Sequence, residues 1–274
     1  MFVKYTDEAI IRPAVAADVP CLLTLWHEAF PEDSGRDIRL FLERIDVSQE
    51  SLITEIEGRP VSMVFMLPAV LQAGQERFPL QYIYAAGTRK DYRGRGLFGD
   101  LLRQALRIAE QQGCTASFLH PAQPSLCDYY ARFGYRPFFY GNELTGGASS
   151  QSMSIRRVSA DEYAKARLTF AQTMVAWEPR FVSYAVQPPC QAVMWSDGCA
   201  LCTPCDDVLV IRDLLCEEEQ QAAVCGALAA GFGCERYRCY ATADRQGEPM
   251  GLLRLLGNIK IPDCAAPHMG LALD

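Results

Sequence analysis

The sequence lacks three features that would assign it to a membrane-bound, secreted or nucleic-acid-binding class. No apolar run reaches the ~18 residues that suggest a membrane span. The first residues, MFVKYTDEAIIRP, contain neither the apolar core nor the cleavage site of a signal peptide. An excess of positive charge is also missing, because the net charge is −7 and the pI is about 5.1. We therefore expect a cytoplasmic protein that binds neither nucleic acid nor a membrane.

Cysteine, in contrast, is abundant, with 12 residues in 274. Without a secretion signal, these residues are expected to be reduced and mostly buried. Cys199, Cys202 and Cys205 have the C-x2-C-x2-C spacing found in some zinc and iron-sulfur sites. The flanking sequence alternates like a strand, which would turn Cys202 away from the other two, and no nearby Cys/His set completes four ligands. We interpret the three residues as structural and predict no metal site.

The order of apolar patterns predicts an α/β protein with one large domain or two small ones. In the first half, alternating or β-branched segments predict strands and segments with apolar residues at helical spacing predict helices. The expected strands are 10–12, a hairpin over 51–71, 78–88, 114–120 and 135–144, and the expected helices are 17–30, 38–45, 97–112 and 124–134.

The second half of the chain repeats this plan. The segment TGGASSQS, residues 145–152, has the composition of a linker. After it, IRRVSADEYAKARLTF from Ile155 resembles IRPAVAADVPCLLTLW from Ile11, with Asp161 in the place of Asp18. Strands, a helix over 217–232 and a strand over 236–242 then follow. We predict domains at residues 1–144 and 153–274, joined by the linker 145–152.

The segment DYRGRGLFGDLL, residues 91–102, contains Gly94, Gly96 and Gly99 in the spacing G-x-G-x-x-G. A dinucleotide-binding turn has these glycines directly after the first strand of a βαβ unit, and an acid ~20 residues later. Here a helix and a hairpin come first, and the next strand ends in Leu119 and His120 without an acid. The segment is therefore not a dinucleotide fingerprint.

The same segment can bind a pyrophosphate. Glycines allow backbone N–H groups to turn inward, and the helix that follows has a partially positive N-terminus. Arg93 and Arg95 add formal charge.

Two motifs resemble those of the GCN5-related N-acetyltransferase (GNAT) superfamily, in the same element order over residues 10–143. The acyl-CoA loop of that family reads Gln/Arg-x-x-Gly-x-Gly/Ala, and the run from Arg93 to Leu97 is similar to it, whereas Phe98 replaces the last small residue. Farther along, YYARFGY places Tyr130 and Gly134 on the family's Phe-Tyr-x-x-x-Gly-Phe motif.

The resemblance implies a GNAT fold, a mixed and splayed β-sheet flanked by helices, with acetyl-CoA as co-substrate and no metal. It implies that the fourth strand splays from the fifth, so that the backbone of Ala86, Gly87 and Thr88 can pair with the pantetheine arm. The pyrophosphate would then contact Arg93, Gly94, Arg95, Gly96, Leu97 and Phe98, with the Phe98 ring turned away. Tyr130 would be the general acid for the leaving thiolate; a core-filling role for this tyrosine is the alternative.

The general base is left open by the sequence. Many relatives carry a glutamate on the fourth strand, but LQYIYAAGT contains no acid. By position, His27, Glu28, Glu32 and His120 are candidates. The chain also resembles the enhanced-intracellular-survival subgroup, in which a C-terminal carboxylate enters the active site, and Asp274 would then have that role.

The second half is not expected to hold a second catalytic site. Where a glycine loop would stand, Glu217, Glu218 and Glu219 would repel a pyrophosphate. We interpret residues 153–274 as a degenerate GNAT-like domain that shapes the acceptor cleft or an oligomer contact. The resemblance implies an N-acetyltransferase acting on an amine of a small molecule or peptide by direct attack; an inactive acyl-CoA-binding sensor is the alternative.

Overall fold

The computed structural model describes residues 9–150, 153–170, 173–257, 261–262 and 266–271. The chain forms two compact units, each treated by itself below. The first unit comprises Met1–Pro68, Pro79–Leu119 and Arg254–Ile259, and the second comprises Ala69–Phe78, His120–Leu253 and Lys260–Asp274.

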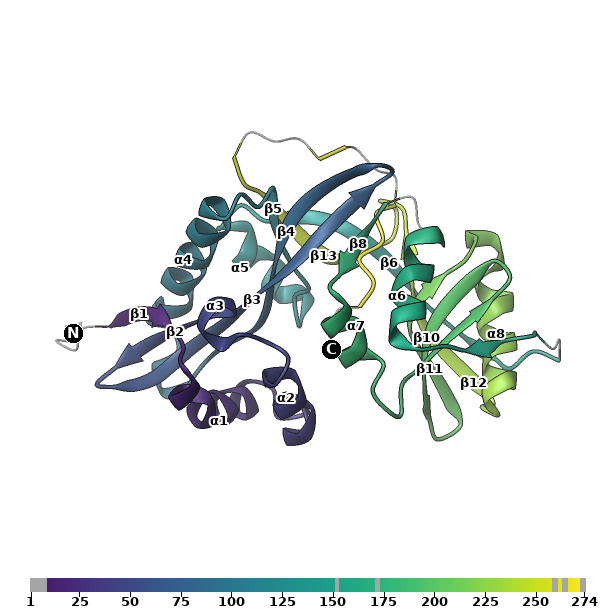
Figure 1. Cartoon of the computed structure of the whole chain (residues 1–274), viewed down its shortest axis with the longest axis horizontal. Coiled ribbons are helices and arrows are strands. Elements are labelled where there is room, and N and C mark those ends of the chain that lie inside the picture. The colour runs from purple at the N-terminus through teal and green to yellow at the C-terminus, as the bar shows by residue number, and fades with distance from the viewer. Residues whose placement is uncertain (1–8, 151–152, 171–172, 258–260, 263–265, 272–274) are drawn as a thin grey trace. The chain divides into compact units, whose positions relative to one another are not determined.

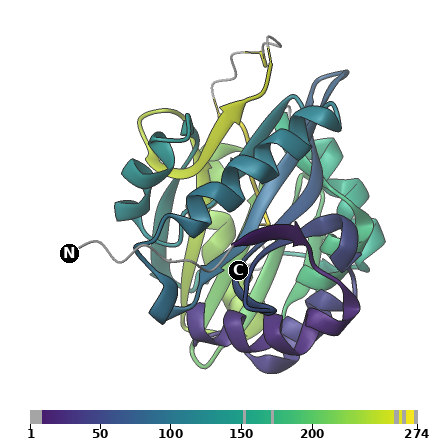
Figure 2. The ribbon, with the colours of Figure 1, turned by 90° about the vertical axis from the view of Figure 1, so that its left-hand side faces the viewer.

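The first unit is a five-stranded sheet with helices on both faces. Along the chain its elements are β1 (Ile10–Pro13), η1 (Ala16–Asp18), α1 (Val19–Ala29), α2 (Gly35–Leu42), α3 (Val47–Glu50), β2 (Ser51–Ile56), β3 (Arg59–Ala73), β4 (Glu76–Thr88), η2 (Lys90–Tyr92), α4 (Leu97–Gln111) and β5 (Ala116–Leu119). The strand order is β1-β2-β3-β4-β5, with β1 antiparallel to β2, β2 antiparallel to β3 and β4 parallel to β5. Helices α1 and α2 lie on one face and α4 on the other (Figure 1 and Figure 2).

The second unit is a larger sheet. Its elements are η3 (Pro124–Leu126), α5 (Cys127–Ala131), β6 (Arg136–Gly147), β7 (Arg156–Arg157), α6 (Ala160–Phe170), β8 (Thr173–Trp177), α7 (Pro179–Ala185), β9 (Gln191–Trp195), β10 (Gly198–Cys205), β11 (Val208–Leu215), η4 (Glu218–Gln220), α8 (Gln221–Phe232), β12 (Arg236–Ala243) and most of β13 (Glu248–Leu255). The strand order is β13-β6-β12-β11-β10-β9-β7, and β8 pairs with the end of β3 at Ala69–Ala73.

The two halves repeat one topology. The neighbours β1, β2, β3, β4 and β5 correspond in order to β7, β9, β10, β11 and β12. In each set the last two strands are parallel and are joined through a helix, α4 or α8. This correspondence supports the proposal that residues 153–274 are a second, GNAT-like domain.

The repeat extends to individual hydrogen bonds. In the first unit Arg12 pairs with Asp18 at 2.7 Å, and the Val15 N–H donates to the same carboxylate at 2.8 Å. In the second unit Arg156 pairs with Glu162 at 2.9 Å, and the Ser159 N–H donates to that carboxylate at 3.1 Å. The position equivalent to Asp18 is therefore Glu162, which the alignment of Ile11 with Ile155 also pairs with Asp18; the prediction of Asp161 was wrong by one residue.

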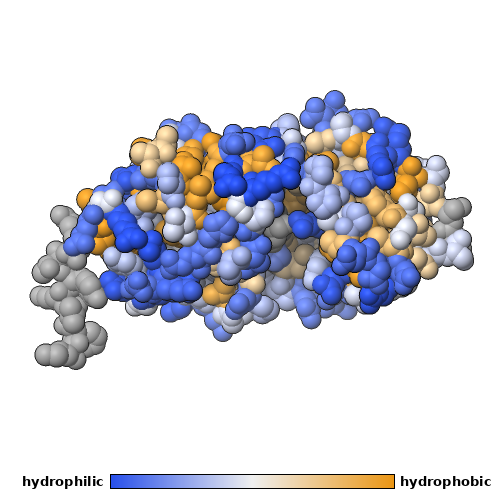
Figure 3. Space-filling model, turned by 90° about the horizontal axis from the view of Figure 1, so that it is seen from below, coloured by the Kyte–Doolittle hydropathy of each residue, from blue (hydrophilic) through white to orange (hydrophobic). Residues whose placement is uncertain are grey.

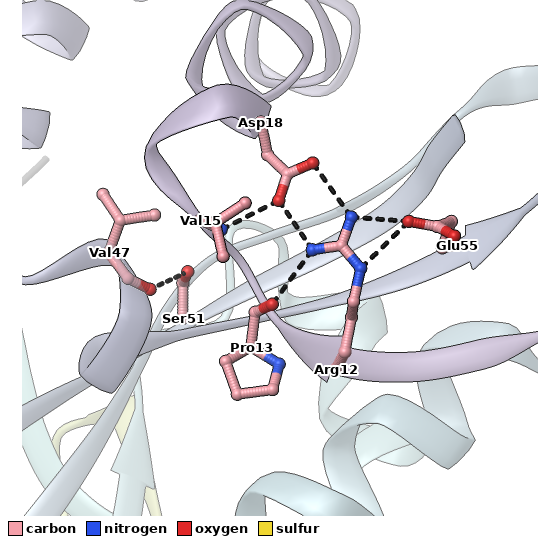
Figure 4. Close-up of polar contacts among 7 residues, drawn as sticks. All are labelled: Arg12, Pro13, Val15, Asp18, Val47, Ser51 and Glu55. Atoms are coloured by element: carbon pink, nitrogen blue, oxygen red, sulfur yellow. Dashed lines mark hydrogen bonds and ion pairs between the residues drawn. The ribbon is translucent and has the colours of Figure 1, made fainter. Parts of the chain in front are cut away.

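Arg12 connects the first strand to the turn before α1. Its guanidinium contacts Asp18 on one side and Glu55 of β2 on the other, with Arg12 Nε donating to Glu55 Oε2 at 2.9 Å (Figure 4). The hydrogen bond from Arg12 is the largest cause that lowers the pKa of Asp18, and it outweighs the opposing effect of burial. Asp18 is thus a buried ion-pair partner rather than only a helix-dipole residue.

Several boundaries differ from the sequence prediction. Strand β6 continues through Gly147, pairing with Arg236 of β12, so the first three residues of the expected linker are strand. Helix α2 begins at Gly35 because Ser34 accepts a hydrogen bond from the Asp37 N–H and caps it. Elements β8, α7 and β13 were not predicted.

The cysteines of β10 lie on different faces of the strand. Cys202 belongs to the apolar cluster beneath α8, whereas the surroundings of Cys199 include Tyr163 and Asp213, and Cys205 is exposed. Burial raises the pKa of both Cys199 and Cys202, which is consistent with thiols that pack as small apolar groups. In the described part of the chain, no three His, Cys, Asp or Glu side chains are grouped so as to hold a metal ion.

The molecular surface drawn in Figure 3 has hydrophilic and hydrophobic residues interspersed. The large apolar side chains that are exposed are Ile10, Val15, Leu168, Tyr240 and Leu255. Among the described helices, none is long and apolar enough to cross a membrane.

Candidate functional site

The glycine segment forms an open turn between β4 and α4 in the first unit. Gly94 and Gly96 have φ angles of 75° and 81°, in the left-handed region that glycine adopts without strain. No atom lies within 4 Å of the position that a Cβ would take at either residue. Gly96 caps α4, whose first-turn N–H groups have no partner within the helix by geometry. The turn therefore combines two left-handed glycines with open space around them and a partially positive helix end.

A bulge at Ala85 bends β4 shortly before this turn. Ala85 has a φ of 42°, which is unusual for a residue with a side chain. The bulge reverses the side-chain alternation, because the Gln81 side chain bonds to the Ala105 carbonyl of α4 whereas the α-carbon of Gly87 faces α1. The pairing between β4 and β5 ends at Tyr82 and Phe118, although β4 continues to Thr88. Strand β4 thus runs past its paired part in the described structure, because β5 itself ends at Leu119; the splay that the family resemblance implies at Ala86–Thr88 stays a prediction.

The three residues predicted to face the pantetheine arm differ in their backbone surroundings. The Gly87 carbonyl accepts a hydrogen bond from Ser62 Oγ of β3 at 3.0 Å, and the Arg89 N–H donates to the Val61 carbonyl at 2.9 Å. The backbone N–H and C=O groups of successive strand residues point in alternate directions. Those of Ala86 and Thr88 therefore point away from β3.

Gly87 has a second role, in packing. A Cβ at this position would lie 2.9 Å from Ala29 Cβ and 3.1 Å from Leu25 Cδ2, both in α1. Only glycine lets α1 approach β4 this closely.

Helix α1 also contacts the backbone directly before the glycine turn. Glu28 Oε1 accepts a hydrogen bond from the Lys90 N–H at 2.5 Å, and Glu28 Oε2 lies 3.8 Å from Arg89 Nη2. The Glu28 carboxylate therefore fixes the start of η2, directly before Arg93. No local sequence pattern predicts this contact, because it joins residues 62 positions apart.

The two arginines of the turn are exposed but oriented. Arg93 Nε donates to the Thr88 carbonyl at 2.9 Å, and Arg95 Nη2 donates to the Asp91 carbonyl at 2.6 Å. The Arg95 guanidinium also stacks 4.7 Å from the centroid of the Tyr92 ring. Phe98, the residue that departs from the family motif, is half-buried in the first turn of α4.

Tyr130 lies in α5, in the second unit, and is 8% exposed. Its ring meets those of Tyr129 and Tyr135 edge-on, with centroids 5.5 and 5.9 Å apart. Burial, followed by the neighbouring Tyr129, raises the pKa of Tyr130 well above its usual value, so the phenol is protonated at neutral pH. A protonated phenol suits a proton donor.

The candidate bases are distributed over the chain. His27 is exposed on α1 and packs on Gly35, and Glu32 is exposed after the same helix. Glu28 is engaged by the loop as described above. His120 follows β5 and is half-buried, and Asp274 lies outside the described residues.

The corresponding junction in the second unit has different chemistry. Here η4 leads directly into α8, whose N-cap is Gln220 in a right-handed conformation. Glu217, Glu218 and Glu219 replace the glycines and arginines. Carboxylates at this helix end would repel a bound anion.

Comparison with known proteins supports the assignment of the fold. Residues 10–138 match the family model of the acetyltransferase (GNAT) domain. No curated protein matches the sequence. A GCN5-related N-acetyltransferase from Kribbella flavida has a similar structure, with 19% identity, a TM-score of 0.73 and coverage of 93% of this chain and 73% of that chain.

Two other solved structures are similar over most of the chain. A probable N-acyltransferase from Enterococcus faecalis has 16% identity and a TM-score of 0.75, and the match covers 91% of this chain and 73% of that one. Eis1 from Mycobacterium abscessus has 16% identity and a TM-score of 0.66, with 90% and 73% covered. The likeness to Eis1 agrees with the predicted likeness to the enhanced-intracellular-survival subgroup, and the GNAT fold is confirmed. Residues 10–138 therefore match an acetyltransferase (GNAT) domain, and the chain has the fold of GCN5-related N-acetyltransferases.

Proposed function

We propose that the protein is an acetyl-CoA-dependent N-acetyltransferase that acts on a primary amine of a small molecule or peptide. The observation that carries the proposal is the open turn at Gly94 and Gly96, which stands at the N-terminus of α4 and directly after a bulged strand. Its left-handed glycines and the partially positive helix end fit a pyrophosphate. When bound there, acetyl-CoA supplies an activated acetyl group as a thioester.

The residues of the first unit would bind and orient the co-substrate. The backbone N–H groups of the turn and of the first turn of α4, together with Arg93 and Arg95, would hold the phosphates. The outward-facing backbone groups of Ala86 and Thr88 would pair with the amides of the pantetheine arm, as a strand pairs with an edge. The acetyl carbonyl would then be presented to a neutral amine.

Transfer would follow by direct attack of the amine nitrogen on the acetyl carbonyl, which forms the amide and breaks the carbon–sulfur bond. The thiolate leaves and takes a proton from the phenol of Tyr130, and the proton that the amine nitrogen loses on becoming the amide restores that phenol. Tyr130 holds its proton at neutral pH, as a donor must, although the burial that raises its pKa makes it a weaker acid than a free phenol.

The test is thermal unfolding of the purified protein with acetyl-CoA, CoA or NADH. A ligand that binds only the folded state raises the unfolding midpoint. We expect acetyl-CoA and CoA to raise it and NADH to leave it unchanged. Gly96→Glu should abolish the effect, because it places a carboxylate at the helix end that is proposed to hold the phosphates.

A matched control separates loss of binding from backbone strain. Gly113, after α4, also has a positive φ, 77°, and open space around its Cβ position. Gly113→Glu should destabilise the protein to a similar degree but retain the response to acetyl-CoA. Stabilisation by NADH alone would contradict the proposal, and CoA binding without amine-dependent thiol release would favour the sensor.

A further inference from the structure

The second unit contains a strand split at the position that corresponds to the ends of β4 and β5. Strands β11 and β12 pair in parallel from Val208 and Arg236 to Ile211 and Cys239. Beyond that point, β11 continues beside β10 and β12 continues beside β6. Residues 212–215 and 240–243 therefore border a gap in the described sheet.

A bulge turns a carboxylate toward one face of this sheet. Leu201 of β10 is opposite Asp213, but the next residue, Cys202, is opposite Ile211, so that Arg212 is the extra residue of β11. Ile211 packs beneath α8, whereas Asp213 is directed toward α6.

Asp213 is fully buried and is held by three donors. Tyr163 Oη and Arg167 Nε, both from α6, each lie 2.8 Å from Asp213 Oδ2, and His268 Nε2 lies 2.6 Å from Oδ1. Burial alone would raise the pKa of Asp213, but the charges of Arg167 and His268 lower it far below its usual value. The carboxylate is thus ionised and needs all its partners.

His268 bridges the two separated strands. One ring nitrogen, Nε2, contacts Asp213 of β11, and the other, Nδ1, lies 2.5 Å from Thr242 Oγ1 of β12. The imidazole occupies the gap between the strands, and its side chain is 7% exposed.

The backbone of His268 forms an isolated, parallel β-bridge with Met174 of β8. The His268 N–H donates to the Thr173 carbonyl of β8, and the Val175 N–H donates to the His268 carbonyl, both at 2.9 Å. Pro267, Met269 and Leu271 are buried as well. Six residues, 266–271, thus form a C-terminal segment seated on the second unit.

Gly270 permits this close approach. A Cβ at Gly270 would lie 2.2 Å from Arg167 Nη2 and 2.8 Å from His268 Nε2, and its φ is +50°. Arg167 Nη2 itself is buried and has no hydrogen-bond partner in the described structure, while the Arg167 side chain is 2% exposed. The segment therefore covers the buried polar groups of Arg167 and Asp213, which would otherwise be open to solvent.

We propose that the split between β11 and β12 is a binding site for the chain's own C-terminal segment, residues 266–271, with the imidazole of His268 as the recognised group. The ligand class is an imidazole held between a carboxylate and a hydroxyl. In the second domain, the protein's own segment thus fills the gap that the first domain would use for pantetheine. That comparison rests on the proposed function, but the binding site itself does not.

The test is substitution of His268 in the full chain, with exogenous imidazole. His268→Ala should lower the unfolding midpoint by about 5 °C or more, because it leaves Asp213 with one fewer donor. The amide of Val175 should exchange its hydrogen at least about tenfold faster, because the segment that holds it is released. Imidazole should restore a large part of both losses. His27→Ala, at an exposed histidine of α1, should show neither loss nor rescue.

A second variant removes no polar side chain. Gly270→Ala should increase the exchange of Val175 in the same way, because the added methyl group displaces the segment from Arg167; imidazole should not restore it. If His268→Ala does not fold, Gly270→Ala alone tests the proposal. Unchanged exchange at Val175 in either variant, or equal effects of imidazole on His268→Ala and His27→Ala, would overturn the proposal. None of these readouts uses acetyl-CoA, so this inference and the proposed function can fail independently.

Discussion

Ala85 and Glu28 shape the glycine turn although neither belongs to a recognisable motif. The positive φ of Ala85 re-aims the end of β4, and the Glu28 carboxylate holds the backbone of Lys90. Both effects position groups that we propose to bind acetyl-CoA. At the residue scale, therefore, contacts made by residues outside the glycine motif position the backbone N–H donors of the turn.

The first prediction distinguishes a loop-holding role for Glu28 from a role as general base. Glu28→Gln should raise the KM for acetyl-CoA about 3- to 10-fold and leave kcat nearly unchanged, because it weakens one charge-assisted hydrogen bond to the loop. Glu110→Gln, at an exposed glutamate near the C-terminal end of α4, is the control and should change neither constant. A large fall in kcat for Glu28→Gln would instead identify Glu28 as the base.

The second prediction concerns Tyr130. Tyr130→Phe should lower kcat about 100-fold or more, because it removes the proton donor for the leaving thiolate. The unfolding midpoint should change little, since the ring and its packing remain. Tyr129→Phe is the matched control on the same helix. An unchanged kcat in Tyr130→Phe would assign this residue to packing alone.

At the scale of elements, the contact between α1 and β4 links the core of the first unit to the candidate site. Leu22, Leu25 and Trp26 of α1 are buried, and Trp26 packs against Phe65 and Tyr84 with ring centroids 5.2 and 5.6 Å away. The same helix carries Glu28. Displacing α1 should therefore affect stability and loop position together.

The third prediction tests this contact through Gly87. Gly87→Ala should destabilise the protein by about 1–3 kcal/mol, because the new methyl group would overlap α1. Denaturant unfolding measures this change in free energy. Gly147→Ala, at a glycine of β6 whose Cβ would lie 3.9 Å from the Glu235 carbonyl oxygen, should change stability far less. Equal effects of the two variants would show that α1 is not tightly packed on β4.

At the scale of the whole molecule, the described chain contains two copies of one topology, and the first of them has the glycine turn that we propose to bind a pyrophosphate. The first copy has glycines and arginines before α4, and the second has three glutamates before α8. The strand split of the second copy is filled by His268.

The fourth prediction is that each chain binds one acetyl-CoA. Isothermal titration calorimetry should give a stoichiometry near one, and Gly96→Glu should remove all binding. Glu218→Arg, in the second copy, should leave the stoichiometry unchanged. Two sites per chain, or residual binding in Gly96→Glu, would contradict the view that the second copy is degenerate.

Local patterns were sufficient to predict most elements and the location of the glycine turn. Apolar residues at helical spacing predicted α1, α4 and α8, and the glycines with their two arginines predicted an anion-binding turn. These features depend on residues close in sequence, so the sequence can reveal them. The internal repeat was also visible, although the prediction of Asp161 as the counterpart of Asp18 missed Glu162 by one position.

Only the tertiary structure decided the remaining features, because they depend on contacts between residues far apart in the chain. A bulge at Ala85 has no sequence signal, since alanine normally avoids a positive φ. The contact of Glu28 with Lys90 and the joining of Asp213 and His268 across 55 positions could not be read from spacing. The sequence by itself determined which segments become strands and helices and where an anion could bind; the folded chain decided which carboxylates hold a loop, which are buried, and what fills the second strand split.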